Sequence, residues 1–328
     1  MDPQTMPVTQ QQPRSALAAA SLGELFLSRV GESPNRMAVA RIPKPGATSA
    51  ERTVIESQTW IEMAAAALRL ADALEGAGLR QGDRVAQLGP HSVDWIVADL
   101  ACLLAGLVHV PLHADATPRE NLEQLDWLGP RGLITSGGPT PLPRSVLRGR
   151  VVVAAEQAWA GAAEPVAVAS APILVSLRQR VAATDPDDCC TIMLSSGTTG
   201  RPRGVMHSQR TLATNAQAAA AVFLDDPQDV RLSWLPASHA LARVGDLYTA
   251  IVRGSCLHVV SDRRRILDLC RALPPTVILG VPVFFERLAM AATGGRIKDL
   301  AVALGGEVRV CISGGSPLRQ RTAEFFAA

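Results

Sequence analysis

The chain has 328 residues, 48% of them hydrophobic, which is enough to bury one large core or two smaller ones. Its 32 basic and 30 acidic residues leave a formal net charge of +2, so charge gives no reason to expect nucleic acid or an anionic membrane as a partner. No run of about 18 uninterrupted apolar residues occurs, and the sequence therefore predicts no transmembrane helix.

Two further features concern the cellular setting. Residues 1–20 are rich in Gln, Pro and Ala and lack an apolar signal core, which predicts a disordered leader. The six cysteines form no C-x-x-C pair, which favours buried free thiols and a reducing, cytoplasmic compartment.

The first half of the chain alternates between helical and strand patterns. A helix is expected after Ser21, a suitable N-cap, and another over Thr59–Glu75, where Thr59 and Glu62 form a capping box. The remaining expected elements are strands at Met37–Ile42, Asp83–Leu88, Leu107–Val110, Gly132–Thr135 and Val151–Ala154, and helices at Val93–Gly106 and Pro118–Leu128. Residues 136–149 and 155–172, rich in Gly, Pro and Ala, are expected to be loops.

The alternation continues in the second half. Strands are expected at Cys190–Leu194, Arg231–Leu235, Cys256–Val260, Thr276–Val281 and Val308–Ile312. Helices are expected at Gln209–Phe223, Val244–Val252, Ile266–Ala272 and Pro282–Ala292. This order predicts an α/β fold with largely parallel sheets flanked by helices.

The most informative segment is a glycine-rich loop, LSSGTTGRPRG, which spans Leu194–Gly204 between a predicted strand and a predicted helix. Small hydroxyl residues and glycines let backbone N–H groups approach phosphate oxygens, and a cation offsets the phosphate charge. It is not a Walker A loop, because no Lys-Ser/Thr pair follows Gly200 or Gly204. Taken alone, such a segment is also typical of a flexible surface turn.

The string from Ser195 to Gly204 resembles the signature of adenylate-forming enzymes, S/T-S-G-T-T-G-x-P-K/R-G. Gly78–Ala86 and Ala101–Leu112 are similar to two scaffold segments of that family, so the resemblance extends from about Ser21 to the end of the chain. It implies the layered N-terminal AMP-binding domain of an adenylate-forming enzyme over residues 21–328.

In that family the loop binds the β- and γ-phosphates of ATP, and one of its hydroxyls lies near the magnesium ion. The resemblance therefore assigns phosphate binding to Ser195, Ser196, Gly197, Thr198, Thr199, Gly200 and Arg203, and metal binding to Ser195.

A second segment, Trp234–Arg243, resembles the L-P-x-S/A-H-x-x-x-R motif of long-chain fatty acyl-CoA synthetases. A lone histidine is more often a packed core residue, but in this motif the histidine lines the acyl pocket near the carboxylate being activated. The resemblance assigns a catalytic role to His239, with Trp234 at the same adenylate and acyl pocket and Arg243 there as a structural or charge partner. The other histidines considered, His91, His109, His113 and His258, have no such context.

Two later segments extend the resemblance. Val281–Leu288 resembles V-P-x-x-F/Y-E-K/R-L/I, and its apolar residues either line an acyl tunnel or pack in the core. Ser313–Leu318 resembles S-G-G-A-P-L, which assigns Gly314, Gly315 and Ser316 to adenylate or acyl binding; an ordinary strand-to-helix turn is the alternative.

The implied function is ATP-dependent activation of a long-chain fatty acid to acyl-adenylate and then acyl-CoA, with ATP, Mg²⁺ and CoA as cofactors and substrates. The family's G-Y-G-x-T-E and T-G-D segments and its small C-terminal domain have no match before Ala328, so we expect a truncated domain that is inactive alone. The alternatives are another carboxylate-adenylating enzyme, such as a fatty acyl-AMP ligase, and a non-catalytic remnant that binds nucleotide or an acyl chain. Peripheral membrane contact is left open.

Overall fold

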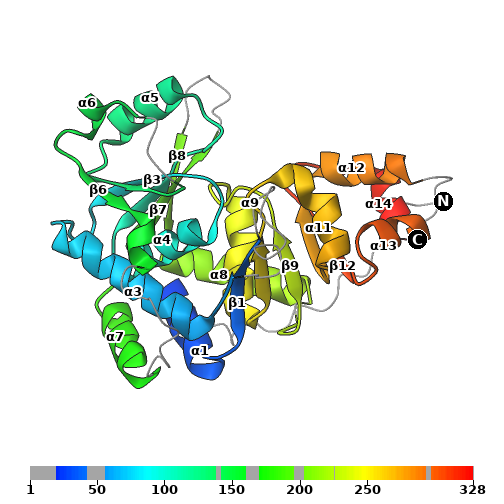
Figure 1. The fold of residues 1–328 in the computed structure, drawn as a ribbon, viewed down its shortest axis with the longest axis horizontal. Helices are drawn as coiled ribbons and strands as arrows, with labels where there is room; N and C mark the ends of the chain where they lie inside the picture. Colours follow the sequence, from blue (N-terminus) through cyan, green and yellow to red (C-terminus); the bar gives the residue numbers. More distant parts are fainter. Residues whose placement is uncertain are drawn as a thin grey trace, which may run out of the picture.

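The computed structural model describes residues 20–42, 56–137, 142–159, 170–195, 203–224, 226–292 and 297–327. Within these ranges strands alternate with helices and form two six-stranded sheets, with a layer of helices between them (Figure 1). The predicted α/β fold with layered, largely parallel sheets flanked by helices is confirmed. Apart from Ala20, the predicted leader lies outside the described residues.

The first sheet has the strand order β6-β5-β3-β4-β7-β8. Its strands are β3 (Arg84–Leu88), β4 (Val108–Pro111), β5 (Gly132–Thr135), β6 (Val151–Ala154), β7 (Cys189–Ser195) and β8 (Arg203–Ser208). The pairs are parallel except for β7 and β8, which are antiparallel. The chain runs from β3 to β4 and then back across β3 to β5, so the direction of the connections reverses between β3 and β5.

The second sheet has the order β12-β11-β9-β10-β1-β2. Its strands are β1 (Met37–Arg41), β2 (Glu56–Thr59), β9 (Val230–Ser233), β10 (Cys256–Val259), β11 (Val277–Gly280) and β12 (Val310–Ser313). Only the pair β1–β2 is antiparallel among the described strands of this sheet. The connections reverse here too, between β9 and β11, because the chain runs from β9 to β10 and then back across β9 to β11.

Three hydrophobic clusters hold the layers together. The largest lies between the sheets and joins Val39 of β1 and Val85 of β3 to the central helices α1 (Leu22–Glu32), α3 (Trp60–Gly76), α4 (Val93–Leu104), α7 (Ser170–Ala182), α8 (Gln209–Val222) and α10 (Thr249–Arg253). The outer face of the first sheet packs on α5 (Pro118–Leu128) and α6 (Arg144–Leu147). The outer face of the second packs on α11 (Ile266–Ala272), α12 (Pro282–Ala291), α13 (Ile297–Ala303) and α14 (Gln320–Ala327).

The helix starts predicted from local sequence are confirmed. The Ser21 hydroxyl accepts the backbone N–H of Glu24 at 3.0 Å, and the Glu24 carboxylate accepts that of Ser21 at 2.6 Å. Thr59 and Glu62 make the same reciprocal pair at the start of α3.

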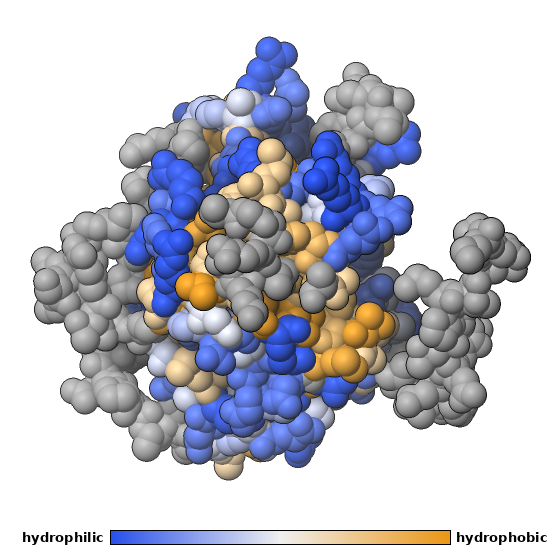
Figure 2. Space-filling model, turned by 90° about the vertical axis from the view of Figure 1, so that its right-hand side faces the viewer, coloured by the Kyte–Doolittle hydropathy of each residue, from blue (hydrophilic) through white to orange (hydrophobic). Residues whose placement is uncertain are grey.

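The outer helices of the second sheet carry an apolar groove of about 490 Å³ beside the edge strand β12. Figure 2 shows this face, where hydrophobic side chains gather. The groove is lined in part by Phe285, Leu300, Leu318 and Phe326. None of the helices in the described ranges has the length and apolarity needed to cross a membrane.

The structure corrects several expectations. The glycine-rich loop does not run from Ser195 to Gly204 and straight into a helix, because Ser195 pairs with Arg203 and strand β8 precedes α8. Strand β2 was also not predicted, and both missed strands are exposed edge strands without apolar alternation. The expected loops over 136–149 and 155–172 contain α6, the 3₁₀ helix η1 (Ala155–Trp159) and the start of α7.

Candidate functional site

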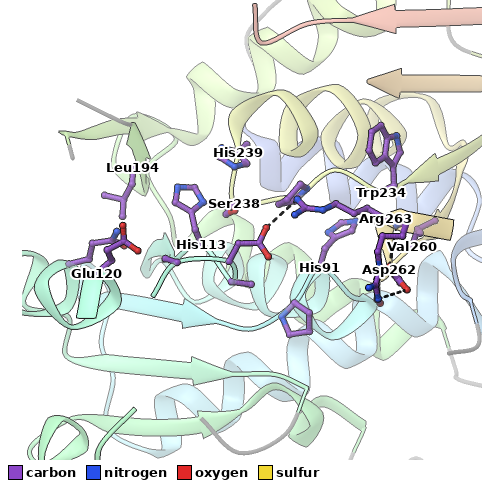
Figure 3. Close-up of a pocket in the computed structure, with 18 of the residues that line it drawn as sticks. His91, His113, Glu120, Leu194, Trp234, Ser238, His239, Val260, Asp262 and Arg263 are labelled. Atoms are coloured by element: carbon purple, nitrogen blue, oxygen red, sulfur yellow. Dashed lines mark hydrogen bonds and ion pairs between the residues drawn. The ribbon is translucent and has the colours of Figure 1, made fainter. Parts of the chain in front are cut away.

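A cleft of about 730 Å³ lies at the carboxyl ends of strands from both sheets (Figure 3). Its walls are the segments that follow β3, β4, β9 and β10, together with the end of β7. In open α/β sheets, ligands bind outside the carboxyl ends of the strands. The cleft borders the carboxyl ends of β3 and β9, the strands from which the chain changes direction in the two sheets.

The predicted phosphate loop begins at the cleft. Ser195 ends β7 and lines the cleft together with Leu194. The pairing of Ser195 with Arg203 makes the glycine-rich segment the connection of an antiparallel hairpin, and Arg203 is exposed at its other end. The five other predicted phosphate-binding residues, Ser196, Gly197, Thr198, Thr199 and Gly200, lie outside the described residues, so their assignment stays a prediction.

His239, the predicted catalytic residue, is exposed in the cleft and caps the short helix α9 (Ala240–Ala242). Its ring stacks on that of His113, with centroids 4.5 Å apart and planes at 24° (Figure 3). Burial, followed by the charge of His113, lowers the pKa of His239 below its usual value. Burial likewise lowers the pKa of His113, so both rings are neutral at pH 7.

His91 and His113 are site residues that sequence reasoning missed. Nε2 of His91 lies 3.1 Å from both the carbonyl oxygen and the hydroxyl of Ser233, and burial lowers the pKa of His91 to about 4. Both histidines follow a predicted strand by two or three residues, and the carboxyl ends of parallel strands share one edge of the sheet. Their position just after predicted parallel strands was the sequence signal that could have identified both as site residues.

Trp234 lines the cleft, and its assignment to the adenylate and acyl pocket stays a prediction. It follows β9, and its indole N–H donates to the carbonyl oxygen of Leu279 at 2.8 Å. Its ring packs against Phe284, with centroids 4.8 Å apart. The cleft therefore has an aromatic wall on the side of the second sheet.

Arg243 does not line the cleft; it lies behind it, 2% exposed, at the start of the π-helix η2 (Arg243–Tyr248). Its guanidinium forms a bidentate ion pair with Asp99 of α4 and donates to the hydroxyl of Thr191 at 2.8 Å. A nitrogen of the same group lies 2.9 Å from Nδ1 of His109, and Tyr248 donates to Asp99 at 2.9 Å. The placement fits a structural charge partner rather than a residue that contacts the adenylate.

The ion pair keeps the carboxylate of Asp99 ionised in the interior. Burial alone would raise the pKa of Asp99, but the charge of Arg243 and the hydrogen bond from His109 hold it well below its usual range. Burial also lowers the pKa of His109, and its Nε2 lies 2.7 Å from the amide oxygen of Gln87. Nδ1 of His109 also lies 3.0 Å from a carboxylate oxygen of Asp99, so His109, Asp99 and Arg243 form one buried polar cluster.

The predicted glycine segment after β12 lies apart from the cleft lining. The N–H of Gly314 donates to the carbonyl oxygen of Gly280 at 3.1 Å, and a Cβ on Gly314 would lie 2.6 Å from a methyl carbon of Leu241. Gly315 has a φ of +84°, and Ser316 is exposed. The segment thus packs against α9, two residues beyond His239, and its proposed contact with the adenylate stays a prediction.

Charged side chains line the rim of the cleft. Asp115, after β4, pairs with Arg263 of the 3₁₀ helix η3 (Arg263–Arg265) at 3.2 Å, which joins the two sheets across the opening. Asp262 caps η3 and pairs with Arg264 at 3.0 Å.

Magnesium binding fits this site only through the nucleotide. Among the described residues, no group of three or more His, Cys, Asp or Glu side chains is arranged to hold a metal ion. Ser195 can supply one hydroxyl ligand, and Mg²⁺ commonly takes most of its ligands from substrate phosphates and water. The assignment of Mg²⁺ to Ser195 stays a prediction.

Known proteins resemble this chain over most of its length. A feruloyl-CoA synthase from Amycolatopsis sp is 30% identical over 264 residues, which cover 79% of this chain and 50% of that protein. The long-chain-fatty-acid–CoA ligase FadD15 of Mycobacterium bovis is 27% identical over 304 residues, which cover 76% of this chain and 50% of that protein. The chain spans about half the length of these curated relatives.

Solved structures agree in fold. ATP-bound MatB from Rhodopseudomonas palustris matches with a TM-score of 0.70 at 24% identity, over 94% of this chain and 57% of that chain. The N-terminal subdomain of Klebsiella oxytoca NpsA, in complex with 3-hydroxyanthranilyl-AMSN, matches with a TM-score of 0.71 at 18% identity, over 96% of this chain and 72% of that chain. A model of the AMP-binding enzyme family matches residues 28–328, and the chain belongs to that family.

Proposed function

We propose that this chain is the ATP- and acid-binding part of an enzyme that activates a carboxylic acid and transfers it to CoA. The observation that carries the proposal is the single cleft at the carboxyl ends of strands of both sheets, with the start of the predicted phosphate loop on one side and His239 on the other. Membership of the AMP-binding enzyme family supports it.

The proposed reaction has two steps. A carboxylate oxygen attacks the α-phosphorus of ATP, the bond from that phosphorus to the bridging oxygen breaks, and pyrophosphate leaves. The thiol of CoA then attacks the acyl carbon, AMP leaves, and the thiol proton is released. Both steps develop negative charge on oxygen, so they need hydrogen-bond donors and cations held in place beforehand.

The residues have distinct proposed roles. Ser195 through Gly200 and Arg203 hold the β- and γ-phosphates, and the Ser195 hydroxyl adds one ligand to the magnesium bound to ATP. His239 borders the activated carboxylate, with Trp234 and the Gly314–Ser316 segment around the acyl-adenylate. Arg243 does not contact the substrate; through its ion pair with Asp99 it holds the segment that carries His239 in place.

For the acid, we propose a long-chain fatty acid. The S-H-x-x-x-R and V-P-x-x-F-E segments and the likeness to FadD15 support this choice. An aromatic acid is the second candidate, favoured by the 30% identity with a feruloyl-CoA synthase and by the packed rings of Trp234 and Phe284 beside the cleft.

Binding of Mg-ATP to the 328-residue chain, measured by calorimetry, tests the proposal. Ser195→Ala should weaken ATP binding by about tenfold, the loss expected for a hydrogen bond to a charged group. Ser28→Ala, on the exposed side of α1, is the matched control and should leave binding unchanged. Lauroyl- and feruloyl-sulfamoyl adenosine, stable mimics of the two adenylates, then compare the candidate acids. A chain that binds neither ATP nor either mimic would refute the proposed function.

A further inference from the structure

The imidazole of His239 is oriented in the cleft by ring stacking rather than by a hydrogen bond. His239 is the N-cap residue of α9, but its imidazole makes no hydrogen bond within the described residues, to the helix or to any other group. Its backbone N–H bonds to the carbonyl oxygen of Pro236 at 3.0 Å, which fixes the chain but not the ring. The ring instead stacks face to face on that of His113.

His113 is itself held firmly. Its Nδ1 lies 3.0 Å from the hydroxyl of Ser238, a residue only 4% exposed that immediately precedes His239. Its backbone is fixed on both sides, since Leu112 donates to the carbonyl oxygen of Gln87 at 2.9 Å and Ala116 donates to that of His113 at 3.1 Å. The ring is therefore clamped between a loop of the first sheet and a segment of the second.

From this geometry we infer that His113 is a positioning residue, which fixes the imidazole plane of His239 against the carboxylate-bearing part of the substrate. The inference rests on the proposed function and deepens it, because it names the group that orients the proposed catalytic histidine. Two rings stacked at 4.5 Å also disfavour simultaneous protonation, so the pair stays neutral and His239 can present one N–H and one bare nitrogen.

The charged groups around the pair bear on its titration. Asp115, on the same loop as His113, raises the pKa of both rings, against the larger lowering by burial. Glu120 of α5 and Arg263 of η3 also line the cleft; Glu120 accepts hydrogen bonds from Thr117, and Arg263 is paired with Asp115. Removing His113 should therefore raise the pKa of His239 towards its ordinary value, since both burial and the neighbouring charge are lost.

Two substitutions separate the parts of the clamp. His113→Ala removes the stack and the contact with Ser238, whereas His113→Phe keeps a flat ring on His239 but cannot be protonated or bond to Ser238. His258→Gln, on β10 and outside the cleft lining, is the matched control for the loss of a histidine. Thermal unfolding checks that each variant is folded.

The first readout is the titration of His239 in the full 328-residue chain, followed by NMR of ¹³C-labelled histidine and assigned with His239→Gln. With six histidines in the sequence, the signals are few enough to resolve. We expect a raised pKa and a downfield ring-proton shift in His113→Ala, a smaller rise in His113→Phe, and no change in His258→Gln. An unchanged pKa and shift in His113→Ala would overturn the inference.

The second readout is affinity for the sulfamoyl adenosine that the wild-type chain binds, compared with affinity for Mg-ATP. In His113→Ala, the loss of an aromatic contact should weaken binding of the sulfamoyl adenosine by about tenfold and leave the affinity for Mg-ATP unchanged. His113→Phe should retain most of the affinity, which a purely structural defect would not restore. Equal losses for both ligands would count against a positioning role. If the wild-type chain binds neither Mg-ATP nor a mimic, the proposed function fails, and the NMR titration still decides whether His113 orients His239.

Discussion

The buried ion pair between Asp99 and Arg243 allows a quantitative test of how the helices between the sheets are held. The two side chains are 3% and 2% exposed, and the contact is bidentate. Asp99→Asn keeps the side-chain volume but removes the negative charge. The guanidinium would then stay buried with neutral partners alone. These are the hydroxyl of Thr191, Nδ1 of His109 and the rings of Trp95 and Tyr248, among the contacts of the described residues.

The expected cost follows from this burial. Removing one partner of a buried pair costs about 3–5 kcal/mol, because the remaining charge is left uncompensated. Whole domains are stable by only roughly 5–15 kcal/mol, so Asp99→Asn should remove a large part of the free energy of unfolding. The exposed pair Arg119–Glu123, at 2.9 Å on α5, is the matched control, and Glu123→Gln should leave stability essentially unchanged.

The assay is urea unfolding followed by circular dichroism. The pKa of Asp99 is depressed in the folded chain, so its stabilising contribution is complete above the usual carboxylate range and is lost only as the pH falls below about 4. The difference between wild type and Asp99→Asn should therefore hold from pH 7 to pH 5 and shrink in more acidic solution. The double variant Asp99→Leu with Arg243→Met should recover most of the stability. A loss within about 1 kcal/mol for Asp99→Asn at pH 7 would refute the reasoning.

Three further outcomes are expected. Burial lowers the pKa of His91 to about 4, so as the pH falls the imidazole is protonated first in the unfolded chain. The free energy of unfolding should therefore drop between about pH 6.5 and pH 4. In His91→Gln, the urea midpoint should depend less on pH over this range. Ser21→Ala removes the acceptor for the N–H of Glu24 and should cost about 1 kcal/mol in thermal unfolding, and a loss near zero would contradict the cap. In Gly204→Val, the new Cβ would lie 2.8 Å from Ile192, so calorimetry should detect a lower melting temperature and weaker ATP binding than in the wild-type chain.

The features that the sequence predicted well depend on residues close together in the chain. The capping boxes at Ser21 and Thr59 are such cases, because each needs only a hydroxyl and a carboxylate three residues apart. The parallel strands of both sheets were also recognisable, since their buried residues form short apolar runs between helical patterns. The string from Ser195 to Gly204 carries the resemblance to adenylate-forming enzymes, and it too is a run of adjacent residues.

The features that were missed depend on partners far away in the chain. Strand β8 is polar and exposed, and only its pairing with β7 makes it a strand. His113 gains its place in the site from a residue 125 positions later, Ser238, and from the ring of His239. Arg243 looked like a cleft residue because it belongs to the same short motif as His239, yet the turn into η2 points it into the interior towards Asp99.

His239 is thus constrained from two directions that meet in one short segment. In front, His113 fixes the plane of its ring; behind, the N–H of Arg243 donates to the carbonyl oxygen of His239 at 3.1 Å, one helical turn along the chain. Arg243 is in turn held by Asp99 of α4 and Thr191 of β7, so the position of the cleft segment depends on contacts in the buried layer. Because a side chain must be held to within about 0.5 Å for catalysis or specific binding, weakening the interior pair should loosen the site before the domain unfolds. Asp99→Asn should therefore change the NMR titration of His239 at temperatures where circular dichroism still reports a folded chain. An unaltered titration would show that the Asp99–Arg243 pair does not position His239.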